Sequence, residues 1–338
     1  MGTFGLTRPV MFPARYSRLD PKALADLVEQ NWELNDPVSC TFVYCGENDL
    51  YRIESGKNTS YLRVYRVRFS DPLRVEPELS VLEEIRTVSD EVSGPIKTKK
   101  GKLFLTIQAF EGERMIAFFE AAPGQMLSRS RVEGWDNFGS ALARLHLAKV
   151  QGIGLPTLTM EEVLQIPLRR WQEQLLALGQ EVRELTDLTE QLAHSMAPIW
   201  DHLPVGLVHG DTAGGNAHLD ASGHLMFFDF MWTGFAPWAW DLGIFRRGAG
   251  EIDENWNAFR TGYDQVRIIE PAELAAIPIF AAIRSVFATA NVIDEGLIDL
   301  QGECSVSWFA GRLNELRRLV AKVSEPLPTA TKGVCNSE

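Results

Sequence analysis

The fold of this chain is decided by two segments, residues 207–218 (LVHGDTAGGNAH) and residues 226–230 (MFFDF). The first segment contains His-Gly-Asp, and Asn216 follows Asp211 by five residues. A short Ser-Gly turn precedes the second segment, an apolar run that reaches Asp229. The apolar residues on each side predict two strands joined by a loop, which would bring the three polar side chains close together.

These three side chains match the needs of phosphoryl transfer to an alcohol. That reaction needs positioning, metal ions on the phosphates and a carboxylate near the attacking hydroxyl. Asp211 is the candidate for this base, and Asn216 and Asp229 offer oxygen ligands that suit Mg²⁺. His209 is predicted to support the loop backbone, and Asp241 to hold the loop from a following helix. The loop pattern alone would also fit an ordinary Gly-rich turn, but the flanking strands and Asp241 favour the functional interpretation.

The same segments resemble a known family. The His-Gly-Asp loop, the Phe-Phe-Asp strand and the sequence PWAWDL at residues 237–242 look like the aminoglycoside phosphotransferase and choline kinase superfamily. The helix end FGSALARLH, residues 138–146, is typical of that family. Residues 47–52 (ENDLYR) and 62–66 (LRVYR) are similar to its stress response kinase A and homoserine-kinase-like branch. The resemblance covers residues 20–320 of the chain.

The resemblance implies an α+β, two-lobed, protein-kinase-like fold with ATP in the cleft between the lobes. The small N-terminal lobe, with an antiparallel sheet, is expected at residues 21–122. The mostly helical C-terminal lobe is expected at residues 123–323. An arm at residues 1–20 and a flexible tail at residues 324–338 complete the predicted domains.

Hydrophobic periodicity predicts elements that agree with this order. A helix is expected at residues 20–32, where Asp20 can cap it. Three strands, a helix and two further strands follow, and the remainder is mostly helical. The expected ranges are strands 40–45, 50–54 and 60–65 (the first two joined by a turn at 46–49), helix 76–87, strands 103–107 and 116–120, and helices 132–148, 158–178, 180–203 and a block at 254–323.

The resemblance also implies residues that bind the nucleotide. Arg63 stands where the family carries the lysine for the ATP phosphates. Arginine keeps the charge but has a longer, planar fork, and an ordinary strand arginine is the alternative. Glu78 is expected to pair with it, with Glu76 as the rival. The loop over the phosphates would contain Gly46, Glu47 and Asn48, and the hinge near 119–122 would include Glu120 and Ala122.

The predicted function is an ATP- and Mg²⁺-dependent phosphotransferase acting on a hydroxyl group of a small molecule, with GTP as an alternative nucleotide. Three departures from the family pattern, at Arg63, Ala213 and Met231, leave open a nucleotide-binding pseudokinase. The resemblance of the N-terminal lobe leaves open a protein serine/threonine kinase. The acceptor itself is not identified by any motif.

Two groups of side chains are candidates for the acceptor site. Trp232 and Trp238 follow the predicted metal ligand and could line a pocket, with core packing as the alternative. Glu251 and Asp253 could bind an amine, with a solvated helix start as the alternative.

Composition limits the remaining classes. The chain has 338 residues and a net charge of −12, which argues against a general nucleic-acid binder and mildly favours a cationic acceptor. Its four cysteines show no metal-ligand spacing, as expected in a reducing compartment. The most apolar segment, residues 274–293, is interrupted by Pro278 and Arg284 and is predicted to be a buried helix rather than a membrane span. A cytoplasmic protein is therefore expected, and no oligomeric state is predicted.

Overall fold

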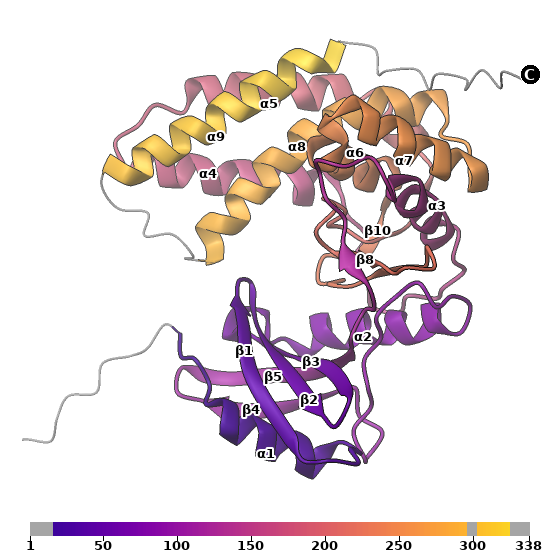
Figure 1. Cartoon of the computed structure of the whole chain (residues 1–338). Helices are drawn as coiled ribbons and strands as arrows, with labels where there is room; N and C mark the ends of the chain where they lie inside the picture. The colour runs from indigo at the N-terminus through magenta and orange to yellow at the C-terminus, as the bar shows by residue number, and fades with distance from the viewer. Residues whose placement is uncertain (1–15, 296–302, 325–338) are drawn as a thin grey trace, which may run out of the picture. The chain divides into compact units, whose positions relative to one another are not determined.

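A computed structural model describes residues 16–295 and 303–324 (Figure 1). Most of the arm predicted at residues 1–20 and nearly all of the tail predicted at residues 324–338 lie outside the described residues. The chain forms two compact units. The first unit comprises residues up to 76 together with 95–121, and the second comprises 77–94 together with the chain from 122 onward.

The first unit is built on a five-stranded antiparallel sheet with strand order β1-β2-β3-β5-β4 (Figure 1). Helix α1, Pro21–Asn31, packs against this sheet. Leu24, Val28 and Trp32 are buried against apolar side chains of the central strands, including Leu62 and Phe118. The strand bounds are β1 Val38–Cys45, β2 Asn48–Ser55, β3 Asn58–Tyr65, β4 Phe104–Ala109 and β5 Gly112–Glu120.

Local sequence explains where these elements begin. Asn48 and Asp49 belong to β2 and pair with Tyr65 and Val64 of β3, so the first hairpin turn is shorter than the predicted 46–49. Helix α2, Pro72–Arg86, begins four residues before the predicted start at 76. The Asp71 side chain accepts a hydrogen bond from the backbone N–H of Leu73 (3.0 Å) and so caps the helix there.

Helix α1 carries the side-chain cap that its sequence predicts. The Asp20 carboxylate accepts a hydrogen bond of 3.0 Å from the backbone N–H of Ala23. Replacing Asp20 by alanine leaves that donor to water, and we expect the free energy of unfolding to fall by about 1 kcal/mol. Urea unfolding of the Asp20→Ala variant measures this change. An unchanged unfolding midpoint would mean that the cap contributes nothing, and Asp26→Ala, on the same helix, is the control.

The second unit contains the remaining helices and two small sheets. Strand β7 pairs with β10, and β8 lies between β6 and β9. The helices are α3 Trp135–His146, α4 Ile166–Ala177, α5 Arg183–Met196, α6 Ala239–Arg247, α7 Asp253–Val266, α8 Pro271–Glu295 and α9 Glu303–Ala321. The strands are β6 Gln125–Met126, β7 Val205–Val208, β8 Ala217–Leu219, β9 Leu225–Phe227 and β10 Gly234–Pro237.

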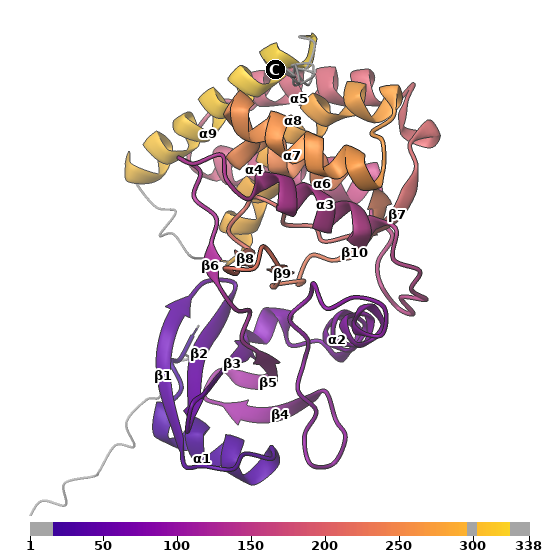
Figure 2. The ribbon, with the colours of Figure 1, turned by 45° about the vertical axis from the view of Figure 1, so that its right-hand side comes forward.

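Helix α8 is the central helix of this unit. Helices α4, α5, α6 and α9 all pack against it (Figure 2). Its segment Pro271–Ile293 is long and apolar enough to cross a membrane by length and composition, with a mean hydropathy of 1.7. However, 78% of that segment's most apolar window is buried inside the protein, as in the core helix of a globular domain.

Helices α3 and α7 pack closely because small residues lie between them. A Cβ atom on Gly262 of α7 would lie 1.8 Å from the carbonyl oxygen of Asp136 on α3. Glycine therefore permits the backbones to approach, and α3 also packs against β7, which precedes the predicted loop, and against β9.

Two predicted helices are shorter in the structure. The helix expected at 158–178 becomes a single π-helical turn, Glu161–Gln165, followed by α4. Pro167 lacks a backbone N–H, which disfavours a continuous regular helix through this point. The helix expected at 180–203 ends at Met196, two residues before Pro198.

Residues 77–94 belong to the second unit, although the predicted boundary at residue 122 places them in the small lobe. The segment after α2 runs beside β9. The N–H of Ser93 donates to the carbonyl of Phe227 (2.8 Å), and the N–H of Phe227 donates to the carbonyl of Glu91 (2.8 Å). Arg144 of α3 binds the Glu91 carboxylate.

Candidate functional site

The predicted catalytic loop, residues 209–216, connects β7 to β8. Strand β7 is paired with β10, and β8 is paired with β9, so both ends of the loop are anchored in sheets. The backbone N–H of Phe228 donates to the carbonyl of Asn216 (3.0 Å), which extends the β8–β9 pairing by one residue. Asp229, the next residue, therefore lies beside the end of the loop.

The Asp241 carboxylate holds the start of this loop. It is fully buried in the first turn of α6 and accepts hydrogen bonds from the backbone N–H groups of His209 (2.7 Å) and Gly210 (2.9 Å). The Thr212 hydroxyl donates to the carbonyl of the same residue (2.6 Å). A buried carboxylate is stable when hydrogen-bond donors surround it, and two of these donors are backbone N–H groups of the loop.

Gly210 is required by this arrangement. Its φ angle is 84°, in the left-handed region, and a Cβ atom would lie 2.0 Å from the carbonyl oxygen of Trp232. A larger residue would push the loop away from the chain that follows Asp229.

His209 connects the loop to the end of β9. Its ring is fully buried, Nδ1 accepts a hydrogen bond from the N–H of Asp211 (3.2 Å), and Nε2 donates to the carbonyl of Phe228 (3.0 Å). This hydrogen-bond pattern assigns the tautomer with the proton on Nε2. His209 therefore fixes the backbone on both sides of the site and has a positioning role.

The Asp211 carboxylate is held at both oxygens. Oδ2 accepts from Nδ2 of Asn216 (2.8 Å), and Oδ1 accepts from Nη2 of Arg284 (2.9 Å). Arg284 lies on α8 and was not among the predicted site residues. Its only signal in the sequence is a single cation inside an otherwise apolar helical run, which was interpreted as a break in that run.

The oxygens beside Asp211 fit a magnesium ion. Because Nδ2 of Asn216 donates to Asp211, the amide oxygen of Asn216 is the atom left for a cation. Asp229 has a φ of 65°, a conformation that is uncommon outside glycine and that occurs at functional sites. Among the described residues no group of three or more His, Cys, Asp or Glu could hold a metal. An ion at Asn216 and Asp229 would therefore take its other ligands from phosphates and water, as Mg²⁺ does.

Arg63, predicted for nucleotide binding, lies on β3 of the first unit. It is buried, with its guanidinium 4.7 Å from the centroid of the Phe119 ring, and Nη1 donates to the Tyr65 hydroxyl (3.4 Å). Between the two predicted partners, Glu78 is buried and Glu76 is exposed, which favours Glu78 for an inward role. A pairing of Arg63 with Glu78 stays a prediction.

The other predicted nucleotide contacts lie at chain turns. Gly46 and Glu47 form the turn between β1 and β2, where the N–H of Gly46 donates to the carbonyl of Asn48 (3.0 Å). Glu120 ends β5, and the carbonyl of Ala122 accepts a hydrogen bond from Nδ1 of His218 (2.9 Å). Their roles toward a nucleotide stay predictions.

The two tryptophans predicted for the acceptor site have different surroundings. Trp232 is partly exposed, and its ring packs edge-on against Phe287 of α8 (5.3 Å between centroids). Trp238 stacks on the imidazole of His146 (5.7 Å) and lies under the guanidinium of Arg267 (4.3 Å). Both side chains are half-buried and each packs against an aromatic ring, and a role of either tryptophan in acceptor binding stays a prediction.

The two predicted acidic residues are engaged in ion pairs. Glu251 binds Arg318 and lies 3.8 Å from Arg129, and Asp253 binds Arg246 (2.9 Å). These pairs satisfy the carboxylates without an acceptor amine, and a role in acceptor binding stays a prediction.

His146 is a buried, titratable residue that contacts Asp241, the carboxylate that supports the loop. It is completely buried, with Nε2 3.2 Å from Oδ2 of Asp241 and Nδ1 2.7 Å from the Tyr263 hydroxyl. Burial is the main cause that lowers the pKa of His146 below its usual value of 6.5, partly opposed by its hydrogen bond to Asp241. Arg267 also lowers this pKa, and Glu273 raises it.

We expect the protein to lose stability as the pH falls below the ordinary histidine pKa of 6.5. In that range the unfolded chain takes up a proton that the folded imidazole resists, so unfolding becomes more favourable. Thermal unfolding measured between neutral and mildly acidic pH checks this. His146→Gln should reduce the slope over the same range. An identical slope in His146→Gln would contradict the assignment.

A family model described as the phosphotransferase enzyme family matches residues 46–277, more than half of the chain. The chain belongs to the phosphotransferase enzyme family. It is 32% identical over 285 residues to an uncharacterized protein of Deinococcus radiodurans, covering 82% of this chain and 83% of that protein. The predicted family and the predicted enzyme class are thereby confirmed.

Two solved phosphotransferase structures resemble the protein in fold. A microcompartment-associated aminopropanol kinase has a TM-score of 0.74 at 22% identity, covering 89% of this chain and 97% of its own. An amicoumacin kinase, solved with AMP-PNP and Ca²⁺, has a TM-score of 0.71 at 18% identity, covering 93% and 96%. The predicted α+β, protein-kinase-like fold is confirmed.

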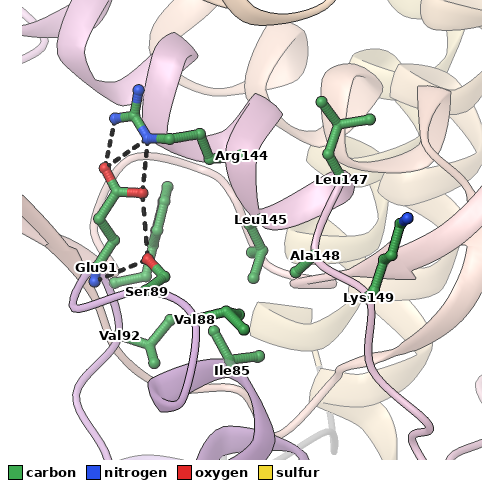
Figure 3. A pocket seen from close by; sticks show the side chains of 11 residues that line it. Ile85, Val88, Ser89, Glu91, Val92, Arg144, Leu145, Leu147, Ala148 and Lys149 are labelled. Carbon is green, nitrogen blue, oxygen red and sulfur yellow. Dashed lines mark hydrogen bonds and ion pairs between the residues drawn. The ribbon is translucent and has the colours of Figure 1, made fainter.

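A separate pocket of about 410 Å³ lies between α2 and α3 of this phosphotransferase (Figure 3). Ile85, Val92 and Leu145 give it an apolar lining, and the ion pair between Glu91 and Arg144 lies at one side. None of the predicted catalytic or metal-binding residues lines it. The loop at Asp211 and this pocket are therefore separate features of the second unit.

Proposed function

We propose that this protein is a small-molecule kinase that transfers the γ-phosphate of a nucleotide to a hydroxyl group. The observation that carries the proposal is the Asp211 carboxylate, held between Asn216 and Arg284 on a loop that Asp241 fixes. A carboxylate with a fixed position and partial exposure suits a base that must meet a substrate hydroxyl. Family membership supports the reaction class.

In the proposed reaction Asp211 orients the acceptor hydroxyl and takes its proton. The hydroxyl oxygen forms a bond to the γ-phosphorus, the bond from that phosphorus to the β,γ-bridging oxygen breaks, and the nucleoside diphosphate leaves with the electron pair. Asp211 then releases the proton to solvent. Asn216 and Asp229 would hold Mg²⁺, which neutralises phosphate charge when it is bound.

ATP is the proposed nucleotide, and GTP is the alternative. Arg63, supported by Glu78, would steady the phosphates, together with the turn at Gly46 and Glu47. Such an enzyme, with an apolar helix buried in its core, is proposed to work in the cytoplasm.

A screen of nucleotide consumption tests the proposal. Purified protein with Mg-ATP or Mg-GTP is offered aminoglycosides, amino alcohols, hydroxy amino acids and a generic protein substrate, with Asp211→Asn as the blank. We expect consumption with a small hydroxylated acceptor that is lost in the blank. Nucleotide consumption with the protein substrate alone would favour a protein kinase. Nucleotide binding without consumption, identical in the blank, would favour a pseudokinase.

A further inference from the structure

Three arginines from three different helices form a group that reaches the catalytic loop through Arg284. Arg284 of α8 binds Asp211 (2.9 Å), while Arg247 of α6 and Arg312 of α9 both bind Glu315 of α9 (2.8 and 3.0 Å). Helix α8 packs against both α6 and α9. We call these three side chains the arginine cluster.

The end of α6 places the cluster at the loop itself. Gly248, next to Arg247, lies so close to the loop that a Cβ atom would be 2.8 Å from the carbonyl oxygen of Ala213. Burial, together with repulsion from Arg284 and Arg312, lowers the pKa of Arg247. Arg284 and the end of α6 that carries Arg247 therefore both lie at the catalytic loop, and Arg312 is joined to Arg247 through Glu315.

The cluster has donors that nothing in the described part of the chain satisfies. Nη1 of Arg284 and Nε of Arg247 and of Arg312 are buried and have no hydrogen-bond partner among the described residues. The side chains of Arg284, Arg247 and Arg312 are 8%, 21% and 37% exposed, so Arg284 is the most buried of the three. Buried donors of a charged group are costly when they are unpaired, so this arrangement fits a ligand that supplies acceptor atoms.

The charge of the cluster indicates what that ligand carries. Within these ion pairs three guanidinium groups meet two carboxylates, Asp211 and Glu315, which leaves one positive charge among the five groups. A single carboxylate would balance it, whereas a phosphate monoester would leave an excess of negative charge beside the base. Arginine also matches the planar geometry of a carboxylate.

We propose that the arginine cluster binds a carboxylate of the acceptor, so that the substrate is a hydroxy acid or hydroxy amino acid. This inference rests on the proposed function, because Asp211 must meet the hydroxyl of the same molecule. Arg284 lies between the base and the carboxylate of the acceptor. Its Nη2 donates to Asp211, and Nη1 on the same guanidinium receives the carboxylate. The hydroxyl and the carboxylate of the acceptor are then only a few bonds apart. Phe287, with its ring centroid 5.1 Å from the Arg284 guanidinium, and Trp232 beside it form an apolar wall.

Matched acceptors that differ only by the carboxylate test this inference. The pairs are L-homoserine with 3-aminopropan-1-ol and L-threonine with 1-aminopropan-2-ol. Binding is measured by calorimetry with AMP-PNP and Mg²⁺, and turnover by ATP consumption. We expect the carboxylate member of at least one pair to bind and to react with the higher kcat/KM.

Substitutions in the cluster separate recognition from folding. Arg247→Gln should weaken binding of the carboxylate member by about tenfold to a hundredfold, the range for hydrogen bonds to charged groups, and leave the amino alcohol unchanged. Glu315 keeps Arg312 as a partner in that variant. Arg284→Lys should weaken the same acceptor while retaining charge. Arg317→Gln, an exposed position on α9, is the control.

The outcomes distinguish this inference from the proposed function. Carboxylate binding that depends on Arg247, without turnover, would support a carboxylate site at the cluster, but it would contradict the proposed function and with it the identification of that ligand as the acceptor. Turnover of both members of each pair with equal kcat/KM would support the proposed function and overturn the inference. Equal losses for both members in Arg247→Gln, no binding of any carboxylate, or tighter binding of inorganic phosphate than of any carboxylate would also overturn it.

Discussion

Replacing Asp211 by asparagine is expected to lower kcat for phosphate transfer roughly 10²- to 10⁴-fold, the range for loss of a positioned general base. Asparagine keeps the shape and can still accept a hydrogen bond from Arg284, but it cannot take a proton from the acceptor. The affinity for nucleotide should fall less than kcat, because Asn216 and Asp229 are retained, although the new N–H₂ group faces Nδ2 of Asn216 and disturbs the orientation of that amide.

The change in Asp211→Asn must be separated from unfolding. Arg284 loses its counter-charge in this variant, so some loss of stability is expected. Circular dichroism and calorimetric titration with AMP-PNP show whether the variant is folded and binds nucleotide. Asp187→Asn, an exposed aspartate on α5, is the matched control and should keep full activity. A folded Asp211→Asn protein with unchanged kcat would remove Asp211 from the mechanism.

Replacing Asp241 by asparagine is expected to lower both stability and activity. The two carboxylate oxygens accept from the N–H groups of His209 and Gly210, and a side-chain amide would present its own N–H₂ group to one of these donors. One backbone donor is then buried without a partner and a charge-assisted bond is lost, so the free energy of unfolding should fall by about 2–4 kcal/mol.

Chemical denaturation and steady-state kinetics check the effect at Asp241. Since Asp241 supports the loop and does not meet the substrate, kcat should fall because Asp211 is misplaced, and lower temperature should recover part of it. Asp187→Asn serves again as the control, because an exposed ion pair contributes less than about 1 kcal/mol. Wild-type stability in Asp241→Asn would mean that the loop is held by other contacts.

The elements that could be predicted are those determined by residues close together in the sequence. Alternating residues placed β3, because each residue of a strand faces the opposite side from the next, whereas β5 contains a continuous apolar run that is buried throughout. The loop from His209 to Asn216 was predictable because the chemistry needs a carboxylate and an amide a few residues apart on one turn. Asp241 could be included because it follows Asp229 at a family-like distance.

The unpredicted part depends on contacts between distant residues. Arg284 meets Asp211 across 73 positions of sequence, and no local pattern indicates which helix faces the loop. The position of residues 77–94 also depends on distant contacts. Glu91 and Ser93 pair with Phe227, and no periodic pattern in the sequence of this segment predicts that pairing. Trp238 is a candidate for the acceptor site because aromatic residues serve both roles, and its contacts with His146 and Arg267, which are distant in sequence, could not be predicted.

The central claim is most directly tested by following the γ-phosphate itself. The protein is incubated with ATP labelled in the γ-phosphate, Mg²⁺ and the acceptor panel, and the label is located in small-molecule, protein and inorganic phosphate fractions. The account predicts label in an acid-stable phosphate ester of a small molecule, absent with Asp211→Asn. Label that appears only on protein, or equally in wild type and Asp211→Asn, would contradict it.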